Sequence, residues 1–171
     1  TVTLTKGNYI SKYPITFEQY DKFCEATGRE KPKDFNWGRG KRPVVDVTWN
    51  DAQAFCEWFG CRLLTEAEWE YACRAGTTTP FSTGDNVTTD QANYDGTEPY
   101  KDYPEGIYRG RTTEVDELDN ENPWGICDMH GNVYEWCADV YDNYPSTAVT
   151  DPTGPATGND RVMRGGSWGH N

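Results

Sequence analysis

The fold of this chain is decided by one long stretch, NPWGICDMHGNVYEW at residues 122–136, together with RGGSW at residues 164–168. Both stretches lie after residue 76, where Gly, Asp, Asn, Thr and Pro alternate with isolated aromatic residues. This composition indicates loops punctuated by short strands. We expect those strands at residues 3–12, 124–127, 132–137 and 161–165.

Before residue 76 the pattern is helical, and three helix starts carry the same capping signature. In each, a threonine hydroxyl can accept the amide at the third helical position, whose own side chain reaches back to the threonine amide. An apolar face follows each start, and a glycine offers a left-handed stop. The predicted helices begin at Thr16, Thr48 and Thr65, with capping partners Gln19, Asp51 and Glu68, and stop near Gly28, Gly60 and Gly76.

The composition predicts a folded domain with an aromatic core. Of 171 residues, 35% are hydrophobic and 14% are aromatic, including seven Trp and eleven Tyr, and the mean hydropathy is -0.89. Disordered chains are poor in aromatic residues, and a chain of this length buries roughly two-thirds of its unfolded surface. The core is therefore expected to consist of few, large, amphipathic side chains.

The charge argues against a nucleic-acid partner, and the apolar pattern argues against a membrane span. The net charge is -12, from 28 acidic and 16 basic residues, so a phosphate backbone would be repelled over most of the surface. We therefore expect no nucleic-acid partner. No stretch approaches the roughly 18 apolar residues of a membrane span, so none is expected in this chain.

The six cysteines do not form a zinc signature. They stand at irregular spacings without a C-x-x-C pair, and the chain has two histidines. Because structural zinc sites use closely paired ligands, we expect none here. Disulfides stay open, since their connectivity does not follow from the number of cysteines. The cysteines are at positions 24, 56, 61, 73, 127 and 137.

Three blocks of the chain resemble the signature blocks of the formylglycine-generating enzyme, or sulfatase-modifying factor, family. They are TEAEWEYACRAG at residues 65–76, the stretch at 122–136, and RVMRGGSW at 161–168. The segments at 9–16 and 46–49 are similar as well, so the resemblance covers essentially the whole chain. It implies an α+β fold of the C-type-lectin-like kind, loop-rich, as a single domain over residues 1–171.

The turn from Asp128 to Glu135 is the strongest candidate site. Calcium takes about six to eight oxygen ligands, which a tight turn supplies when carboxylates begin and close it and backbone carbonyls line it. Asp128, the carbonyls of Gly131 and Val133, and Glu135 meet this description. The spacing is not that of an EF-hand, and by itself it also fits a capped turn with Glu135 in solvent. The resemblance points to the same four positions, so we expect structural calcium there.

A second calcium site is implied by the resemblance alone. It would use Asn93 and the carbonyl of Tyr94, completed by an acidic residue farther along the chain. The corresponding stretch, PEGIY at 104–108, lacks an Asp at the expected place. The sequence leaves this second site open.

Catalysis in the family that the chain resembles depends on two cysteines that bind copper(I) shortly after the Gly-Gly-Ser-aromatic block. Thiolates suit copper(I), and histidine is a different ligand. Here the first position is His170, and the second would lie beyond Asn171. Copper is therefore expected only if the chain is an enzyme whose catalytic tail is missing. A dyad of Cys127 and His130 is not expected to replace the pair, because a buried cysteine usually acts as a small hydrophobe.

The resemblance also implies disulfides from Cys56 and Cys73 to cysteines of a C-terminal segment. That segment would follow Asn171, so we expect both thiols to be free or otherwise engaged. The chain accordingly reads as a domain truncated at its C terminus.

Two of four candidate functions fit the residues best. The first is a non-catalytic ligand-binding domain, as in the variable proteins of diversity-generating retroelements. Trp168, His170 and Asn171 would then begin a surface that binds a protein or other surface ligand, because aromatic and Asn side chains suit such surfaces. Trp168 alone also reads as a core residue under the last strand. The second is a copper-dependent oxidase that acts on sulfatase cysteines.

Two further functions are less well supported. An iron-dependent sulfoxide synthase would bring an additional helical domain with histidine ligands, which this sequence lacks. A structural module without a ligand of its own has no distinguishing signal. We favour the ligand-binding domain, a calcium-braced scaffold that presents loops near its C terminus. The compartment is not determined by the sequence, and the cell surface or another extracytoplasmic location is favoured.

Overall fold

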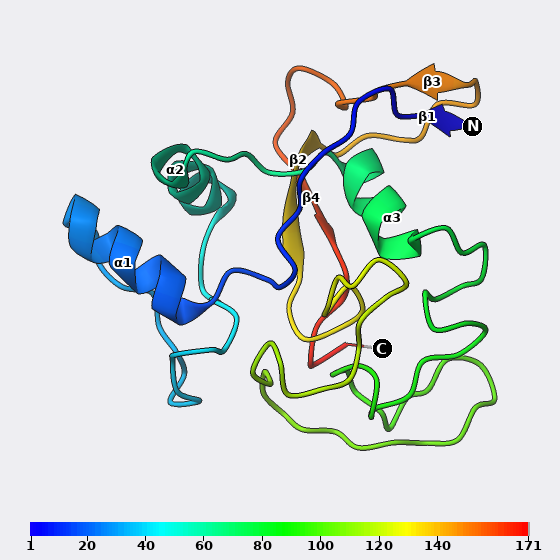
Figure 1. The fold of residues 1–171 in the computed structure, drawn as a ribbon, viewed down its shortest axis with the longest axis horizontal. Coiled ribbons are helices and arrows are strands. Elements are labelled where there is room, and N and C mark those ends of the chain that lie inside the picture. Colours follow the sequence, from blue (N-terminus) through cyan, green and yellow to red (C-terminus); the bar gives the residue numbers. More distant parts are fainter. Residues whose placement is uncertain (171) are drawn as a thin grey trace.

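Three helices and four short strands are held together by long irregular segments in the computed structural model, which describes residues 1–170 (Figure 1). The mixture of helices and strands confirms the predicted α+β class. The elements, in chain order, are β1 (Val2–Thr3), α1 (Phe17–Thr27), α2 (Trp49–Phe59), α3 (Glu66–Arg74), β2 (Glu135–Val140), β3 (Val149–Thr150) and β4 (Arg161–Arg164).

The helices begin where the capping boxes predict. Thr16, Thr48 and Thr65 each accept a hydrogen bond from the amide three residues on, and the side-chain oxygen of that residue accepts one from the threonine amide. Left-handed glycines end α1 and α2, with φ of 70° at Gly28 and 83° at Gly60. The third helix ends one residue before the predicted glycine, at Ala75, whose φ of 45° is unusual for alanine.

The strands pair in two small sheets. β2 and β4 are antiparallel, with Glu135 opposite Arg164, and an irregularity interrupts the register before the far end of the pair. β1 and β3 are parallel. The predictions of strands at 132–137 and 161–165 are therefore confirmed in substance, with β2 beginning later and running to Val140.

Two predicted strands were wrong. Residues 124–127 form no strand because the Oδ1 atom of Asn122 takes two of their amides, accepting from Trp124 at 3.0 Å and from Ile126 at 3.1 Å. Of residues 3–12, only the first pairs in a sheet, as part of β1. Farther along, the amide of Thr5 donates to the carboxylate of Asp151 rather than to a neighbouring strand.

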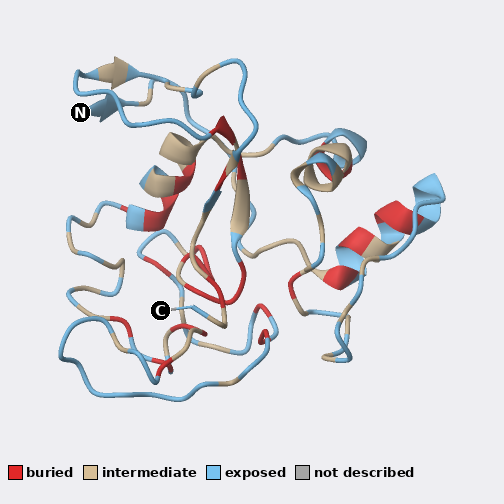
Figure 2. Cartoon of the chain, turned by 180° about the vertical axis from the view of Figure 1, so that it is seen from behind, coloured by how far each residue is buried: buried red, intermediate tan, exposed pale blue. Residues whose placement is uncertain are grey.

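The core consists of two clusters of buried side chains (Figure 2). One lies between α1 and α2 and is aromatic, as predicted, with the rings of Tyr20 and Phe55 stacked at 5.5 Å. The other lies between α3 and the β2–β4 sheet and mixes rings, aliphatic groups and sulfur. Its members are Trp69, Ala72, Cys73, Ile126, Met129, Cys137 and Val162.

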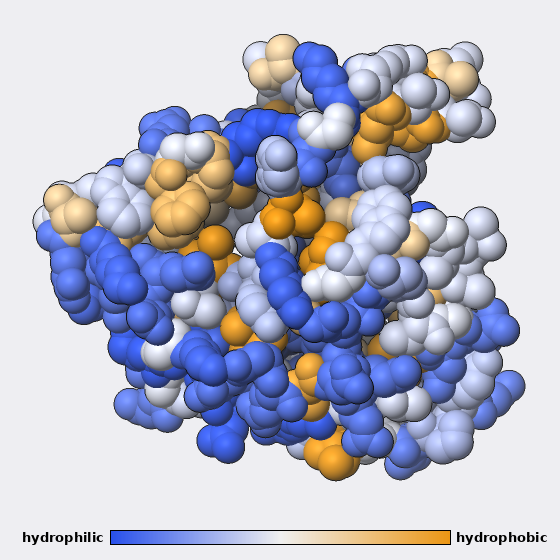
Figure 3. All heavy atoms as spheres, viewed as in Figure 1, coloured by the Kyte–Doolittle hydropathy of each residue, from blue (hydrophilic) through white to orange (hydrophobic). Residues whose placement is uncertain are grey.

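The long segment between α3 and β2 contains no helix or strand in the described chain, and it covers one end of the molecule (Figure 1). The last residues reach it, since the amide of Asp95 donates to the carbonyl of His170 at 3.2 Å. Hydrophilic side chains dominate the face drawn in Figure 3. None of the helices that residues 1–170 form has the length and apolar character needed to cross a membrane.

Candidate functional site

The turn from Asp128 to Glu135 has a backbone that only particular residues allow. Asp128, Gly131 and Asn132 have positive φ values of 58°, 81° and 63°. A Cβ atom on Gly131 would lie 2.4 Å from the carbonyl oxygen of Asn93. Glycine is therefore required at this position both for its backbone angle and for the close approach of the segment around Asn93.

Backbone hydrogen bonds hold the turn from both sides. The amide of Asn132 donates to the carbonyl of Asn93 at 2.7 Å, and the amide of Gly131 donates to that of Gly165 at 2.7 Å. The carbonyl of Asn132 in turn accepts from the amide of Trp168 at 3.1 Å. The turn is thus fixed between the long loop and the RGGSW block, two regions that the sequence keeps far apart.

A buried amide network, which the sequence pattern did not predict, lies behind the turn. Asn93 and Asn132 are both fully buried. The Oδ1 atom of Asn132 accepts from the Nδ2 atom of Asn93 at 3.2 Å and from the amide of Thr113 at 2.9 Å. The signature contains Asn132, but nothing in the spacing of Thr113 predicts that the two would meet.

The first carboxylate of the turn is buried and only partly satisfied. Asp128 is 2% exposed, and its Oδ1 atom accepts from the Nδ2 atom of Asn120 at 2.7 Å. Its Oδ2 atom is buried and finds no donor among the described residues. Burial raises the pKa of Asp128 to about 6, because the charged form loses its hydration.

The second carboxylate of the turn, that of Glu135, also accepts a hydrogen bond and has a raised pKa. The Oε2 atom of Glu135 accepts from the indole Nε1 of Trp69 at 2.9 Å. Although the side chain keeps partial contact with solvent, the surrounding protein raises the pKa of Glu135 to about 7, and the negative charge of Asp128 adds to the rise. Neither carboxylate takes part in a salt bridge within residues 1–170.

These residues fit a hard cation better than a transition metal. A buried carboxylate beside a half-buried one, both without a positive partner, is costly unless something neutralises the pair. Gly131 and Val133 could add carbonyl oxygens, which calcium accepts as ligands. In the described part of the chain, no group of three or more His, Cys, Asp or Glu side chains converges on a point where a metal ion could sit, so a cation at this turn would depend on the carbonyl oxygens as well.

Of the two residues predicted for a second calcium site, Asn93 belongs to the same network. Asn93 has a buried Oδ1 atom without a donor among the described residues, while its Nδ2 atom is bound to Asn132 and to the carbonyl of Arg111. The hydroxyl of Tyr94 donates to the carbonyl of Val87 at 2.9 Å. Glu105, the acidic residue of the stretch at 104–108, is exposed. This second site stays a prediction without an identified acidic ligand.

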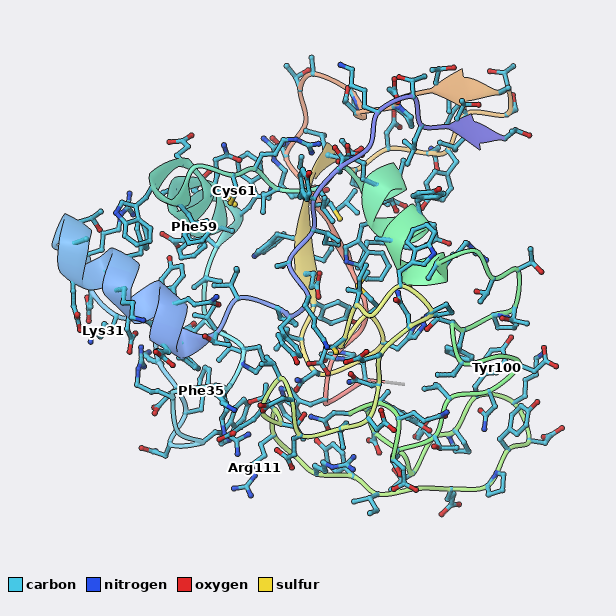
Figure 4. All side chains as sticks on the ribbon, viewed as in Figure 1. Lys31, Phe35, Phe59, Cys61, Tyr100 and Arg111 are labelled. Carbon is cyan, nitrogen blue, oxygen red and sulfur yellow. The ribbon has the colours of Figure 1, made fainter. Side chains whose placement is uncertain are left out.

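A cavity of about 660 Å³ opens beside the turn, at the C-terminal end of the described chain. His170 is exposed at its wall, where its Nδ1 atom lies 2.8 Å from the Oγ atom of Ser167 and its ring lies 5.3 Å from that of Tyr134. Tyr100 reaches the same cavity from the long loop (Figure 4). Aromatic and polar walls therefore come from distant segments, and no sequence signal predicted that His170 and Tyr100 would share one cavity.

Trp168 lies between two other rings rather than in either core cluster. It is half-buried, 5.1 Å edge-on from Trp37 and stacked on Tyr108 with centroids 6.2 Å apart. Trp168 is thus part of an aromatic group near the surface. The third predicted binding residue, Asn171, lies outside the described residues.

His130 faces Cys73 and not Cys127. Its Nε2 atom is 3.8 Å from the Sγ atom of Cys73 and accepts a hydrogen bond from the amide of Ser82 at 3.1 Å. Accepting at Nε2 assigns the ring proton to Nδ1, and burial lowers the pKa of His130. Burial also raises the pKa of Cys73 to about 12, so this thiol is not a ready nucleophile near neutral pH.

Comparisons with known proteins agree with the signatures. The family profile described as sulfatase-modifying factor enzyme 1-like domain matches residues 1–171. The serine/threonine-protein kinase pkn1 of Chlamydia caviae is 36% identical over 94% of this chain and 28% of its own length. The formylglycine-generating enzyme of Streptomyces coelicolor is 38% identical over 77% of this chain and 43% of its own length. This chain therefore spans less than half of either relative.

A solved structure has a similar fold. That of Treponema denticola variable protein 1 has a TM-score of 0.72 and 26% sequence identity, and the match covers 94% of this chain and 73% of that chain. The scaffold described above is therefore one that both a named enzyme and a variable protein share.

Proposed function

This chain belongs to the sulfatase-modifying factor enzyme 1-like family, and within that family we propose that it is a non-catalytic domain that binds a ligand at its C-terminal end. The ligand would be a protein or another surface ligand, in the manner of retroelement-diversified variable proteins. The likeness to Treponema denticola variable protein 1 supports this proposal at the level of the scaffold.

His170 is the observation that carries the proposal. The resemblance assigns its position to the first copper-binding cysteine, yet here it is an imidazole held by Ser167 and placed beside Tyr134. An imidazole nitrogen does not reproduce the thiolate that copper(I) prefers. An exposed imidazole among aromatic rings is suited to recognition by contact and hydrogen bonding.

The cavity beside His170 supports binding. Its walls combine the rings of Phe81, Tyr94 and Tyr100 with a few polar groups, among them Ser167. Ligand sites are typically concave, mainly apolar surfaces with few polar groups that fix orientation. Trp168, with Trp37 and Tyr108, would extend such a surface outward.

We further propose that calcium braces this surface from behind. The carboxylates of Asp128 and Glu135 and the carbonyls of Gly131 and Val133 would hold the ion, which would neutralise two charges that the protein leaves unpaired. The unsatisfied Oδ2 atom of Asp128 supports this proposal. Because the same turn binds the amide of Trp168 and lines the cavity, calcium would also restrict the motion of the binding surface.

The alternative is a formylglycine-generating oxidase acting on sulfatase cysteines, and a direct assay separates the two. The full-length protein is loaded with copper(I) and incubated in oxygen with a cysteine-containing sulfatase peptide. A binding domain retains no copper(I) at a thiolate pair and leaves the peptide unchanged. Conversion of the peptide cysteine to formylglycine would show that the proposal is wrong.

Binding itself is tested with arrays of peptides and glycans. Array signals should fall in His170→Ala and Tyr100→Ala, because both side chains line the cavity. They should persist in Lys31→Ala, a control in the segment after α1, away from the cavity (Figure 4). Signals that survive both cavity variants would place binding elsewhere.

A further inference from the structure

The C-terminal end of α2 brings two cysteines together. The amides of Gly60 and Cys61 both donate to the carbonyl of Cys56 at 2.9 Å. The second of these bonds closes the chain back onto the last helical turn, as in a Schellman motif. In that motif the residue after the left-handed glycine packs against a residue of the last turn. Here both residues are cysteines.

The two thiols differ in how far solvent can reach them. Cys56 is 7% exposed, whereas Cys61 is exposed at the surface beside Phe59 (Figure 4). Both line one cavity of about 370 Å³, together with Leu63. A small reagent from solvent would therefore meet Cys61 first and find Cys56 behind it.

The electrostatics of the cysteines agree with this shared position at the helix end and in one cavity. Burial is the main cause that raises the pKa of Cys56 to about 12, and the thiol of Cys61 is the next. Burial also raises the pKa of four other cysteines, and in none of them is another thiol among the causes. Those four are Cys24, Cys73, Cys127 and Cys137.

We propose that Cys56 and Cys61 form a redox-active dithiol, which low-molecular-weight disulfides such as oxidised glutathione convert to an intrachain disulfide. The thiolate of Cys61 attacks one sulfur of the external disulfide, and the first thiol leaves as a mixed disulfide forms. Cys56 then loses its proton to solvent and attacks the sulfur of Cys61, which releases the second thiol. The raised pKa of Cys56 keeps its thiolate scarce near neutral pH, and the placement of both residues at one helix end offsets this by making the attack intramolecular. The protein gives up two electrons and two protons, and the external disulfide leaves as two thiols.

This disulfide would connect α2 to the sheet. The segment after Cys61 leads to Leu64, which packs against the second core cluster and whose carbonyl accepts from the amide of Ala138 in β2 at 2.7 Å. Oxidation would therefore fix the end of α2 relative to β2. The inference is independent of the proposed ligand-binding function, and it differs from the partner beyond Asn171 that the resemblance implies for Cys56.

A peptide map tests the pairing in the full-length protein. The folded protein is equilibrated with oxidised glutathione, its remaining thiols are alkylated in denaturant, and it is cleaved after glutamate. Cleavage after Glu57 separates Cys56 from Cys61 in sequence. We expect their two peptides to stay joined until reductant is added, with the other four cysteines alkylated. Oxidation of the unfolded chain, as a control, should give mixed pairings.

Two variants test the order of the steps. Cys56→Ser should stop at the mixed disulfide and keep one glutathione on Cys61. Cys61→Ser, at an exposed position, should leave Cys56 alkylated. The proposal is overturned if Cys61 of the unmutated protein remains a thiol or a stable mixed disulfide, or if it pairs with a cysteine other than Cys56. The map of the unmutated protein decides this even if a variant fails to fold.

Discussion

The region up to α3 and the region after it keep their shapes by different means. In the first, each helix begins at a capping box and packs an apolar face, so neighbouring residues determine the structure. In the second, buried polar side chains such as Asn132 bind groups many residues away, and several residues have positive φ. The comparison teaches that the helical region tolerates single losses, whereas the loop region depends on each polar group keeping its partner.

The largest effect is expected at Gly131. Gly131→Ala should lower the free energy of unfolding by about 3–5 kcal/mol, since strain from the positive φ adds to a clash with the carbonyl of Asn93. Gly28→Ala is the matched control in the helical region, because its φ is 70° and nothing lies within 4 Å of the added Cβ. It should cost about 1–2 kcal/mol. If both variants lose the same free energy of unfolding, measured by urea denaturation, the two regions do not differ in this respect.

Asn132→Ala should cost about 2–3 kcal/mol, because it leaves the buried amide of Thr113 without an acceptor and removes one of the two acceptors of the Asn93 Nδ2 group. The exposed Asn143→Ala provides the control and should stay within about 0.5 kcal/mol of the unmutated protein. Chemical denaturation measures both. A small effect at Asn132 would mean that water replaces its side chain.

Acid should weaken the helical region through Glu68. A hydrogen-bonded ion pair with Arg62 holds the pKa of Glu68 at about 2, below its ordinary 4.5. The stabilisation is complete above the unfolded value and is lost as the pH falls through about 2. It should amount to about 1–2 kcal/mol, since solvent screens the half-exposed Arg62. Glu68→Gln keeps the capping box and should flatten this part of the pH profile, measured by thermal unfolding in acid.

The smallest effect concerns a single cap. Thr48→Ala removes the hydroxyl that accepts from the amide of Asp51 and should cost about 1 kcal/mol. Thr147→Ala, exposed in the loop region, should cost less than about 0.5 kcal/mol. If Thr48→Ala lowers the free energy of unfolding by more than Asn132→Ala does in the same urea series, interactions between neighbouring residues would determine stability in both regions.

The sequence predicted the helical region better than the loop region, because neighbouring residues determine the structure of the helical region. Helix starts could be located because Thr16 and its counterparts carry their partners three residues away. The strand at 124–127 was wrong because the side chain of Asn122 takes the amides that a ladder would use, which apolar patterning does not register. Asp128 and Glu135 were singled out individually, but their hydrogen-bond partners Asn120 and Trp69 were not, since only the folded chain brings them together.

The most direct measurement is the melting temperature of the full-length protein with calcium and with chelator, across pH. The raised pKa values of Asp128 and Glu135, about 6 and about 7, mean that the calcium-free folded state binds more protons than the unfolded chain. Without calcium, stability should therefore rise as the pH falls through these values.

With calcium at a hundred times its dissociation constant, the protein should gain about 2.7 kcal/mol near neutral pH, and this gain should fade as acid protonates the two carboxylates. Glu135→Gln should abolish the response, whereas Asp116→Asn, at an exposed ion pair, should retain it. A melting temperature that calcium leaves unchanged, with one pH profile in both conditions, would contradict the claim that this turn is a cation site supporting the binding surface.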